Sequence, residues 1–339
     1  MLSELEFSDL YIRLDKPELA RYRTVPQGIK MAENLVVPDQ YNQDVERLRG
    51  LLMGNLKEDS RLDYSGMRFR TSRQTMGNGE SWIALRRLWD HVPQLDQIGL
   101  HPNLLEPLRT LGLRQGLILL GGATGAGKTT TATAILVEYL RRYGQLALTI
   151  EDPIEYDLHG VHGKTGFCYQ REVEEDEEWA SALKTALRWH PRYILVGEIR
   201  TPPAAKQLLR AATSGHLVIT TIHSGSLEET VYAAIQMAHP ELGELSHNLV
   251  ADGLVAVIHQ TMTNDGPKVT FCTTRDQAGG LGDPIRACIR DQKIGMITTF
   301  VEQQASRLGV SGGGAFLPEK ALKRLKEASE QAEKAKRRR

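Results

Sequence analysis

The sequence predicts an α/β protein whose parallel sheet is covered by helices on both faces and follows a smaller α+β domain. From about residue 112 onward, short apolar segments alternate with longer amphipathic segments, a pattern typical of βαβ units. A glycine-rich motif that can bind phosphate stands between one apolar segment and the helical segment after it. Roughly the first hundred residues instead mix strand-like and helix-like pieces without regular alternation.

The composition is that of an ordinary soluble globular protein, with 41% hydrophobic and 25% charged residues. A chain of 339 residues can form about two domains with separate cores. Lys plus Arg and Asp plus Glu both number 42, so no overall electrostatic preference for nucleic acid or membrane follows. No apolar run approaches the roughly 18 residues of a spanning helix, and the N-terminus lacks a signal pattern. Three scattered cysteines form neither a disulfide framework nor a CxxC pair, which favours a reducing cytoplasmic compartment.

The N-terminal region predicts a compact α+β domain. Segments 9–14 and 67–74 alternate enough to predict strands, whereas 43–56 has the apolar spacing of one helix face. Turn residues at 76–81 break the region up. We expect this domain and its linker to occupy residues 1–105.

The second domain, expected at 106–305, begins with regular alternation of strands and helices. After about residue 240 the sequence predicts mainly helices with one hairpin at 263–271. A flexible, basic helical tail is expected at 306–339. The alternating part predicts strands at 116–122, 146–150, 193–197 and 216–221 and helices at 128–144, 177–189 and 202–213.

The phosphate-binding motif is the most specific local signal. Residues 122–129 fit G-x-x-x-x-G-K-[ST] at every fixed position, with a predicted strand before and a helix after. Backbone N–H groups of the loop and the helix N-terminus would bind phosphate oxygens. Lys128 would reach the β- and γ-phosphates, and the Thr129 hydroxyl would ligate Mg²⁺. The predicted nucleotide-binding residues are Gly122, Ala123, Thr124, Gly125, Ala126, Gly127, Lys128, Thr129 and Thr130.

Acidic side chains follow two other predicted strands. Glu151, Asp152 and Glu155 lie at the end of the strand at 146–150, and Glu198 ends the strand at 193–197. Ligands of open α/β sheets bind at the carboxyl ends of the strands. Glu155 could position or deprotonate an attacking water. Glu198 stands in the place of a Walker B acid, with a water-bridged Mg²⁺ contact or water activation as its role.

Two histidines flank the strand at 216–221. His216 begins it and His223 follows it, and we interpret the pair as phosphate sensors or hydrogen-bond relays. The sequence lacks the N-K-x-D motif with which a GTPase reads its base. This absence argues against a GTPase.

The order of GATGAGKTT, TIEDPIEY, QREV, ILVGEIR and SGHLVITTIHS resembles the secretion ATPase family, which includes the motors of type II secretion, type IV pili and type IV secretion. The resemblance covers roughly 105–300. It is closest to the pilus-retraction ATPases and to the Dot/Icm-type and plasmid-conjugation ATPases of type IVB systems. It implies a RecA-like P-loop NTPase motor domain behind an N-terminal PAS-like domain, with ATP and Mg²⁺ as cofactors.

The resemblance assigns roles to individual residues. Glu155 matches the general base of the family's Asp box, Glu198 its Walker B glutamate and His223 its His-box histidine. Thr129 and Glu198 are the implied Mg²⁺ contacts. The segment DYSGMRFRTSRQ resembles a family strand whose arginines reach the nucleotide from the N-terminal domain. Its candidates, with one from the next strand, are Arg68, Arg70 and Arg86.

Several positions depart from the family pattern. Arg192 stands where the family commonly has an acid, Thr201 where an Asp usually follows the conserved Arg, and Ala233 where these motors usually carry an Arg. Arg286 and Arg290 lie four residues apart in a segment that resembles the AIRNLIRE segment of retraction motors. The departures leave the hydrolytic residues intact and bear on how subunits and partners are contacted.

The resemblance further implies a homohexameric ring that works at the cytoplasmic face of a bacterial inner membrane, with platform or secretion-channel proteins as partners and peripheral membrane association. The four-cysteine zinc module of assembly motors is absent from the sequence. We favour a type IVB-like secretion or conjugative transfer motor, with a pilus retraction ATPase as the alternative. A nucleic-acid motor and a non-hydrolysing scaffold are the candidates from other classes. A basic tail is usually a solvated helix, so direct nucleic-acid binding is not expected.

Overall fold

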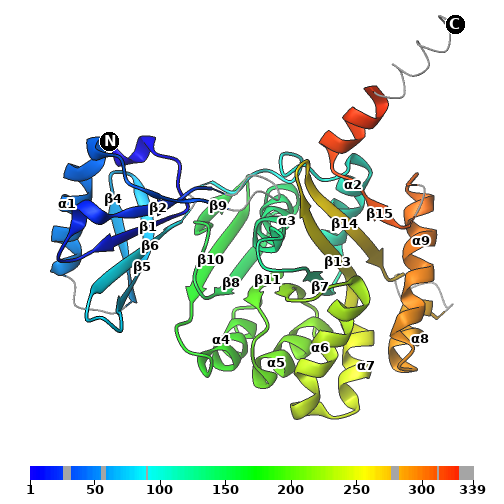
Figure 1. Ribbon diagram of the computed structural model, residues 1–339. Helices are drawn as coiled ribbons and strands as arrows, with labels where there is room; N and C mark the ends of the chain where they lie inside the picture. Colours follow the sequence, from blue (N-terminus) through cyan, green and yellow to red (C-terminus); the bar gives the residue numbers. More distant parts are fainter. Residues whose placement is uncertain (26–31, 55–58, 89–90, 276–281, 311–312, 328–339) are drawn as a thin grey trace, which may run out of the picture. The chain divides into compact units, whose positions relative to one another are not determined.

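The computed structural model divides the chain into two compact units (Figure 1). The first unit contains Met1–His91 and Glu155–Asp157. The second contains Val92–Ile154 and Leu158–Arg339. The structure describes all residues except 26–31, 55–58, 89–90, 276–281, 311–312 and 328–339.

The first unit is an antiparallel sheet of six strands in the order β3-β2-β1-β6-β5-β4. Helix α1 (Asn42–Met53) packs one apolar face on it, because Val45 and Leu48 join Phe69 and Leu85 in one buried cluster. The expected helix and the expected strands at 9–14 and 67–74 are confirmed. The strands are β1 (Asp9–Arg13), β2 (Arg21–Arg23), β3 (Asn34–Val36), β4 (Asp59–Tyr64), β5 (Met67–Thr75) and β6 (Ser81–Leu88), and the short 3₁₀ turns are η1 (Leu2–Glu4), η2 (Pro17–Leu19) and η3 (Asp39–Tyr41).

The second unit is built on a nine-stranded sheet in the order β15-β14-β13-β7-β12-β11-β8-β10-β9. The six strands from β13 to β10 in this order run parallel, and β14, β15 and β9 are antiparallel additions at the two edges. The strands are β7 (Gly116–Gly121), β8 (Leu146–Glu151), β9 (Gly160–His162), β10 (Gly166–Glu172), β11 (Tyr193–Glu198), β12 (Leu217–Ile222), β13 (Leu254–Thr263), β14 (Gly266–Thr273) and β15 (Ala315–Phe316).

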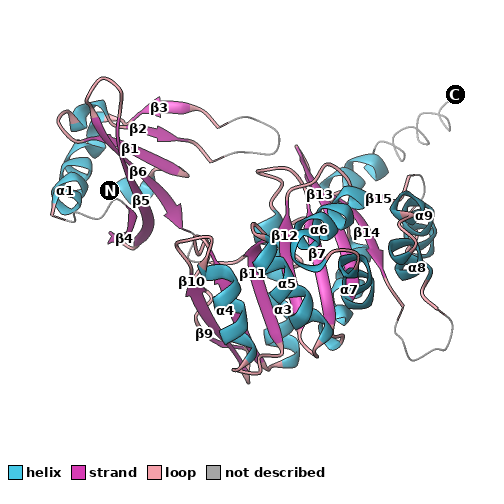
Figure 2. Ribbon diagram, turned by 90° about the horizontal axis from the view of Figure 1, so that it is seen from below, coloured by secondary structure: helices cyan, strands magenta, loops and turns pink. Residues whose placement is uncertain are grey.

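Helices cover both faces of this sheet, as the sequence predicts. In Figure 1, α2 and α3 lie above the strands and α4 to α7 lie below them. Figure 2 views the molecule from below, and there α4, α5 and α7 lie in front of the same sheet. Every residue of β7 and β12 is therefore buried. The helices are α2 (Pro102–Thr110), α3 (Lys128–Tyr143), α4 (Glu178–Leu187), α5 (Pro202–Thr213), α6 (Leu227–Leu242), α7 (Leu245–Gly253), α8 (Pro284–Arg290) and α9 (Ile297–Arg307), with 3₁₀ turns η4 (Leu111–Leu113) and η6 (Ile294–Met296).

The region after residue 240 corrects one expectation. A hairpin is present, but its first strand, β13, begins at Leu254 in a region expected to be mainly helical. The segment LVAVI at its start is apolar throughout, because this part of β13 is buried and α6 packs against it. A short buried segment without alternation does not distinguish a strand from a buried helix.

The expectation of a flexible tail at 306–339 is also partly wrong. Residues 315–316 form the edge strand β15, and the Phe316 side chain is fully buried. Residues 319–327 are helical, which agrees with the expected helical character. The last part of the tail, 328–339, lies outside the described residues.

Candidate nucleotide-binding site

The loop between β7 and α3 has the backbone that a phosphate cradle requires. Gly122, Gly125 and Gly127 have φ angles of 149°, 79° and 80°, values that side chains with a Cβ rarely adopt. A Cβ on Gly122 would lie 2.3 Å from the carbonyl oxygen of Gln260, so only glycine fits there. Ala123, Thr124 and Gly125 form the exposed part of the loop. The N–H groups at the start of α3 are therefore accessible to a phosphate at the carboxyl end of the sheet.

The Lys128 side chain packs against the same loop that would bind the phosphate. Its side chain is buried, and Nζ donates hydrogen bonds to the carbonyl oxygens of Gly122 at 2.8 Å and Ala123 at 3.0 Å. Nζ also lies 3.4 Å from Nδ1 of His223. These contacts place the ammonium charge at the mouth of the loop, where it can neutralise phosphate oxygens. Thr129 and Thr130 are half-buried in the first turn of the same helix.

His223 connects Lys128 to Glu198. Its Nε2 lies 3.0 Å from Oε1 of Glu198. A lysine ammonium can only donate hydrogen bonds, so Nδ1 of His223 must be the acceptor. Nε2 is then the donor of the hydrogen bond to the Glu198 carboxylate.

Arg200 holds the other side of the Glu198 carboxylate. Its Nε lies 3.2 Å from Oε2 of Glu198, and Nη1 lies 2.7 Å from Oδ2 of Asp152. Nη2 donates to the Asp152 carbonyl at 3.3 Å. Burial lowers the pKa of Arg200, whereas hydrogen bonds and charge from Glu198 and Asp152 raise it, and the net shift is upward. A permanently charged guanidinium therefore ties the end of β11 to the end of β8.

Glu151 differs from Glu198 and Asp152 in its burial and in its hydrogen-bond partners. Its side chain is buried and accepts hydrogen bonds from the Thr149 hydroxyl at 2.5 Å and from Nε2 of Gln170 at 3.1 Å. Gln170 lies on β10, the neighbour of β8. The Glu151 carboxylate therefore links these two strands.

Gln260 supports the phosphate loop and was not expected from the sequence. Its side chain on β13 is 1% exposed. Nε2 donates to the carbonyl of Ala126 at 2.6 Å, and Oε1 accepts from the Thr131 hydroxyl at 2.8 Å. One carboxamide thus holds both the loop and the first turn of α3. A polar residue at the end of an apolar strand was the signal that could have indicated it.

The expected histidine pair is not brought together. His216 precedes β12, and its Nδ1 contacts the Pro191 carbonyl at 2.6 Å, whereas His223 follows β12. At about 3.3 Å per residue the two ends of this strand are roughly 20 Å apart. The expectation that His216 acts at the phosphate is wrong, and its contact is structural.

The expected N-terminal arginines lie on two neighbouring strands of the first unit. Arg70 on β5 and Arg86 on β6 are direct cross-strand partners. Arg68 lies 2.6 Å from Asp157, and Nε of Arg86 lies 3.8 Å from Asp9.

Glu155 belongs to Glu155–Asp157, which groups with this first unit. Its role as general base, and those of Arg68, Arg70 and Arg86 at the nucleotide, stay predictions.

Three arginines singled out in the sequence, one of them a departure from the family pattern, contact their own unit. Nη2 of Arg192 donates to the carbonyls of Leu113 and Arg114 at 2.8 and 2.9 Å, so this residue binds its own chain. Arg286 is buried and donates to the Leu254 carbonyl at 3.0 Å, whereas the exposed Arg290 pairs with Asp252. These arginines stabilise the second unit itself.

The described residues contain no group of three or more His, Cys, Asp or Glu that could hold a metal ion without a ligand's help. Both oxygens of Glu198 already have partners in His223 and Arg200. This arrangement fits a Mg²⁺ ion that is held mainly by nucleotide phosphates and Thr129, with Glu198 acting through water. Within the described part of the chain, no helix has the length and apolar character to cross a membrane.

The chain is similar to a family of known proteins. The family described as "Type II/IV secretion system protein" matches residues 57–293. The chain belongs to this family. It is 36% identical over 272 residues to the uncharacterized protein YggR of Escherichia coli, covering 75% of this chain and 81% of YggR. It is 30% identical over 277 residues to the type IV pilus retraction ATPase PilT of Pseudomonas aeruginosa, covering 80% of this chain and 75% of PilT.

The fold of this family member is shared with a solved structure of the pilus retraction motor PilT with bound ADP. The TM-score is 0.67 at 27% identity, and the match covers 89% of this chain and 87% of that one. The expected RecA-like ATPase fold with an N-terminal domain is confirmed.

Proposed function

We propose that this secretion-family ATPase works as a homohexamer whose ATP hydrolysis, with Mg²⁺, powers a type IVB-like secretion or conjugative transfer machine. Hydrolysis of ATP is the activity of its family. The observation that supports the site assignment is the continuous contact Lys128–His223–Glu198 at the mouth of the phosphate loop. The His223 imidazole thus links the Lys128 ammonium, which binds phosphate, to the Glu198 carboxylate.

Phosphoryl transfer depends mainly on positioning and charge neutralisation. Loop N–H groups and Lys128 hold the phosphates, and Mg²⁺ held with Thr129 neutralises charge on their oxygens. Glu155 orients or deprotonates the attacking water. His223 responds to the γ-phosphate because any shift of Lys128 toward that group changes the hydrogen bond that Nδ1 accepts. The response passes through Nε2 to Glu198.

The substitution Glu198→Gln tests the assignment. It keeps the side-chain volume but removes the negative charge that faces His223 and Arg200. We expect steady-state ATP turnover to fall by about 100-fold or more, with the affinity for a fluorescent ATP analogue within about threefold. Glu241→Gln, which removes a carboxylate paired with Lys206 on α5, is the matched control. Unchanged turnover in Glu198→Gln would contradict the catalytic role and favour a non-hydrolysing scaffold.

In the ring, arginines of the N-terminal domain serve catalysis by reaching the nucleotide of a neighbouring chain. Arg70 on β5 and Arg86 on β6 are direct cross-strand partners and so lie on one face of the sheet, and guanidinium groups bind phosphate oxygens well. Light scattering of the chain with ATP and Mg²⁺ tests the assembly: a mass of about six chains supports the ring, and a monomer contradicts it.

The identity of the machine has a second candidate. The similarity to PilT of Pseudomonas aeruginosa favours pilus retraction. The transfer motor is favoured by the departures at Arg192 and Thr201 and by the divergent N-terminal domain, which weaken the match to the standard retraction ATPase. Deletion in the native host, followed by assays of twitching motility and conjugative transfer, separates the two. Loss of transfer with normal motility supports our proposal, and the reverse result supports retraction.

A further inference from the structure

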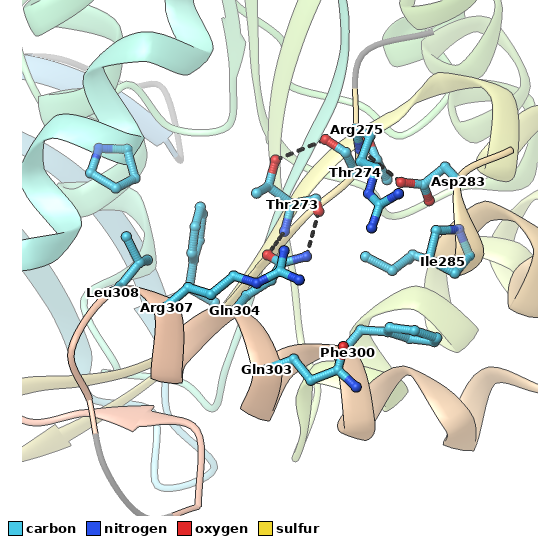
Figure 3. A pocket seen from close by; sticks show the side chains of 13 residues that line it. Thr273, Thr274, Arg275, Asp283, Ile285, Phe300, Gln303, Gln304, Arg307 and Leu308 are labelled. Carbon is cyan, nitrogen blue, oxygen red and sulfur yellow. Dashed lines mark hydrogen bonds between the residues drawn. The ribbon is translucent and has the colours of Figure 1, made fainter. Parts of the chain in front are cut away.

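A cavity lies at the opposite end of the sheet from the phosphate loop. It has a volume of about 300 Å³ and lies between β14, α8 and α9 (Figure 3). Because β14 is antiparallel to β13, its last residue, Thr273, pairs with Ala256 near the start of β13. The phosphate loop instead follows the end of β7. This cavity is therefore separate from the nucleotide site.

The walls of the cavity are largely apolar. Phe271 and Ile285 are buried parts of its lining, and Phe300 and Leu308 are half-buried parts of it. A volume of this size accommodates one or two large aliphatic or aromatic side chains. Its ligand should therefore present an apolar group.

The edge of β14 beside the cavity is completed by a side chain instead of a strand. Among the described residues, β15 pairs with Val269 and Thr270 and with no later residue of β14. Farther along, Oε1 of Gln304 accepts from the Thr273 N–H at 2.9 Å, and its Nε2 donates to the Thr273 carbonyl at 2.8 Å (Figure 3). The Gln304 carboxamide thus makes the two hydrogen bonds that one residue of an added strand would make.

The mouth of the cavity is positively charged. Arg275 and Arg307 are exposed, and among the described residues neither guanidinium has an acidic partner. The one carboxylate that lines the cavity, Asp283, caps α8: Oδ2 accepts from the Arg275 backbone N–H at 2.7 Å and Oδ1 from that of Arg286 at 2.8 Å. A ligand with carboxylates next to its apolar group matches this pattern.

We infer that this site binds an extended, acidic segment of a partner protein. The segment adds to the β14 edge at Thr273 in place of the Gln304 carboxamide. An apolar side chain enters the cavity, and carboxylates face Arg275 and Arg307. The C-terminal segment of the chain itself is basic and carries the same sign of charge as these arginines. A separate acidic partner is therefore the occupant.

The first experiment uses a fluorescein-labelled octapeptide of alternating leucine and aspartate with the full-length protein. Alternation places leucines on one face of a strand and carboxylates on the other. Fluorescence anisotropy should show saturable binding with a Kd below about 1 mM. The corresponding leucine–lysine peptide should bind at least about tenfold more weakly. Equal binding of both peptides, or none to the acidic one, overturns the inference.

The second experiment uses paired variants. Arg275→Glu with Arg307→Glu should weaken binding of the acidic peptide at least about tenfold, whereas Arg210→Glu on the exposed face of α5 should not. Gln304→Ala frees the Thr273 backbone and should tighten binding about fivefold, whereas the neighbouring Gln303→Ala should leave it unchanged. This increase in affinity cannot come from loss of structure. Unchanged binding in both Gln304→Ala and the double arginine variant overturns the inference.

Discussion

Nε2 of His223 lies 3.0 Å from Oε1 of Glu198, and this contact joins the end of β12 to the end of β11. On its other side the same imidazole accepts a hydrogen bond from Lys128. His223 thus contacts both Lys128 and Glu198. The contact depends on two strands that are neighbours in the sheet but separated by α5 in the sequence.

His223→Ala should uncouple these groups. We expect kcat for ATP hydrolysis to fall by about 10- to 100-fold while nucleotide affinity changes little, because the loop and Lys128 keep their own hydrogen bonds. Steady-state kinetics and titration with a fluorescent nucleotide measure the two quantities. His216→Ala is the matched control at the far end of the same strand and should retain wild-type kcat. Equal losses in both variants would contradict a specific role for His223.

Gln260→Leu should loosen the phosphate loop. The change removes the hydrogen bonds to the Ala126 carbonyl and the Thr131 hydroxyl and leaves these buried groups without a partner. We expect a loss of about 1 to 3 kcal/mol in the free energy of unfolding and weaker nucleotide binding. Urea denaturation and nucleotide titration test this expectation. A variant with lowered stability but unchanged affinity would show that the carboxamide serves the fold alone.

The sequence predicted what is encoded in short, continuous segments. The phosphate loop was found because all its residues lie within one motif, and β7, β8, β11 and β12 were found because short apolar segments alternate there with helical ones. The strand β13 was missed because it follows two successive helices, α6 and α7, outside this alternation, and an apolar segment without a period does not distinguish a strand from a buried helix. The contact of Arg200 with Asp152 joins residues far apart in the sequence and depends on the order β11-β8 in the sheet. The role of Gln260 was missed for the same reason, because the residue meets the loop only after β13 pairs with β7.

Gly144→Ala should destabilise the chain strongly. Gly144 ends α3 with a φ of 69°, and a Cβ there would lie 2.2 Å from the Thr165 hydroxyl oxygen. The left-handed conformation costs about 1 to 2 kcal/mol for a residue with a Cβ, and the steric clash adds to it. The control is Gly50→Ala, in an exposed position of α1 with no atom near the new Cβ. This change should stabilise by about 0.5 to 1 kcal/mol, and thermal unfolding of both variants measures the opposite signs.

His101 gives the second unit a pH-dependent contribution to stability. Its Nδ1 accepts a hydrogen bond from the Asn103 N–H at 3.1 Å and caps α2. The ring is largely buried and packs edge-on against Phe316, with 5.4 Å between ring centroids. Burial lowers the pKa of His101 below its ordinary value of 6.5. A protonated Nδ1 could no longer accept the capping hydrogen bond.

The lowered pKa fixes the direction of the effect. The unfolded chain binds a proton at His101 more readily than the folded chain, so stability is complete above the ordinary value of 6.5 and is lost as the pH falls through the folded pKa. His101→Asn keeps a side chain that caps helices well but does not titrate in this range. Between about pH 7.5 and about pH 5.5, the unfolding temperature of the wild type should therefore fall more than that of His101→Asn. Parallel decreases in the two proteins would show that protonation of His101 is not coupled to folding.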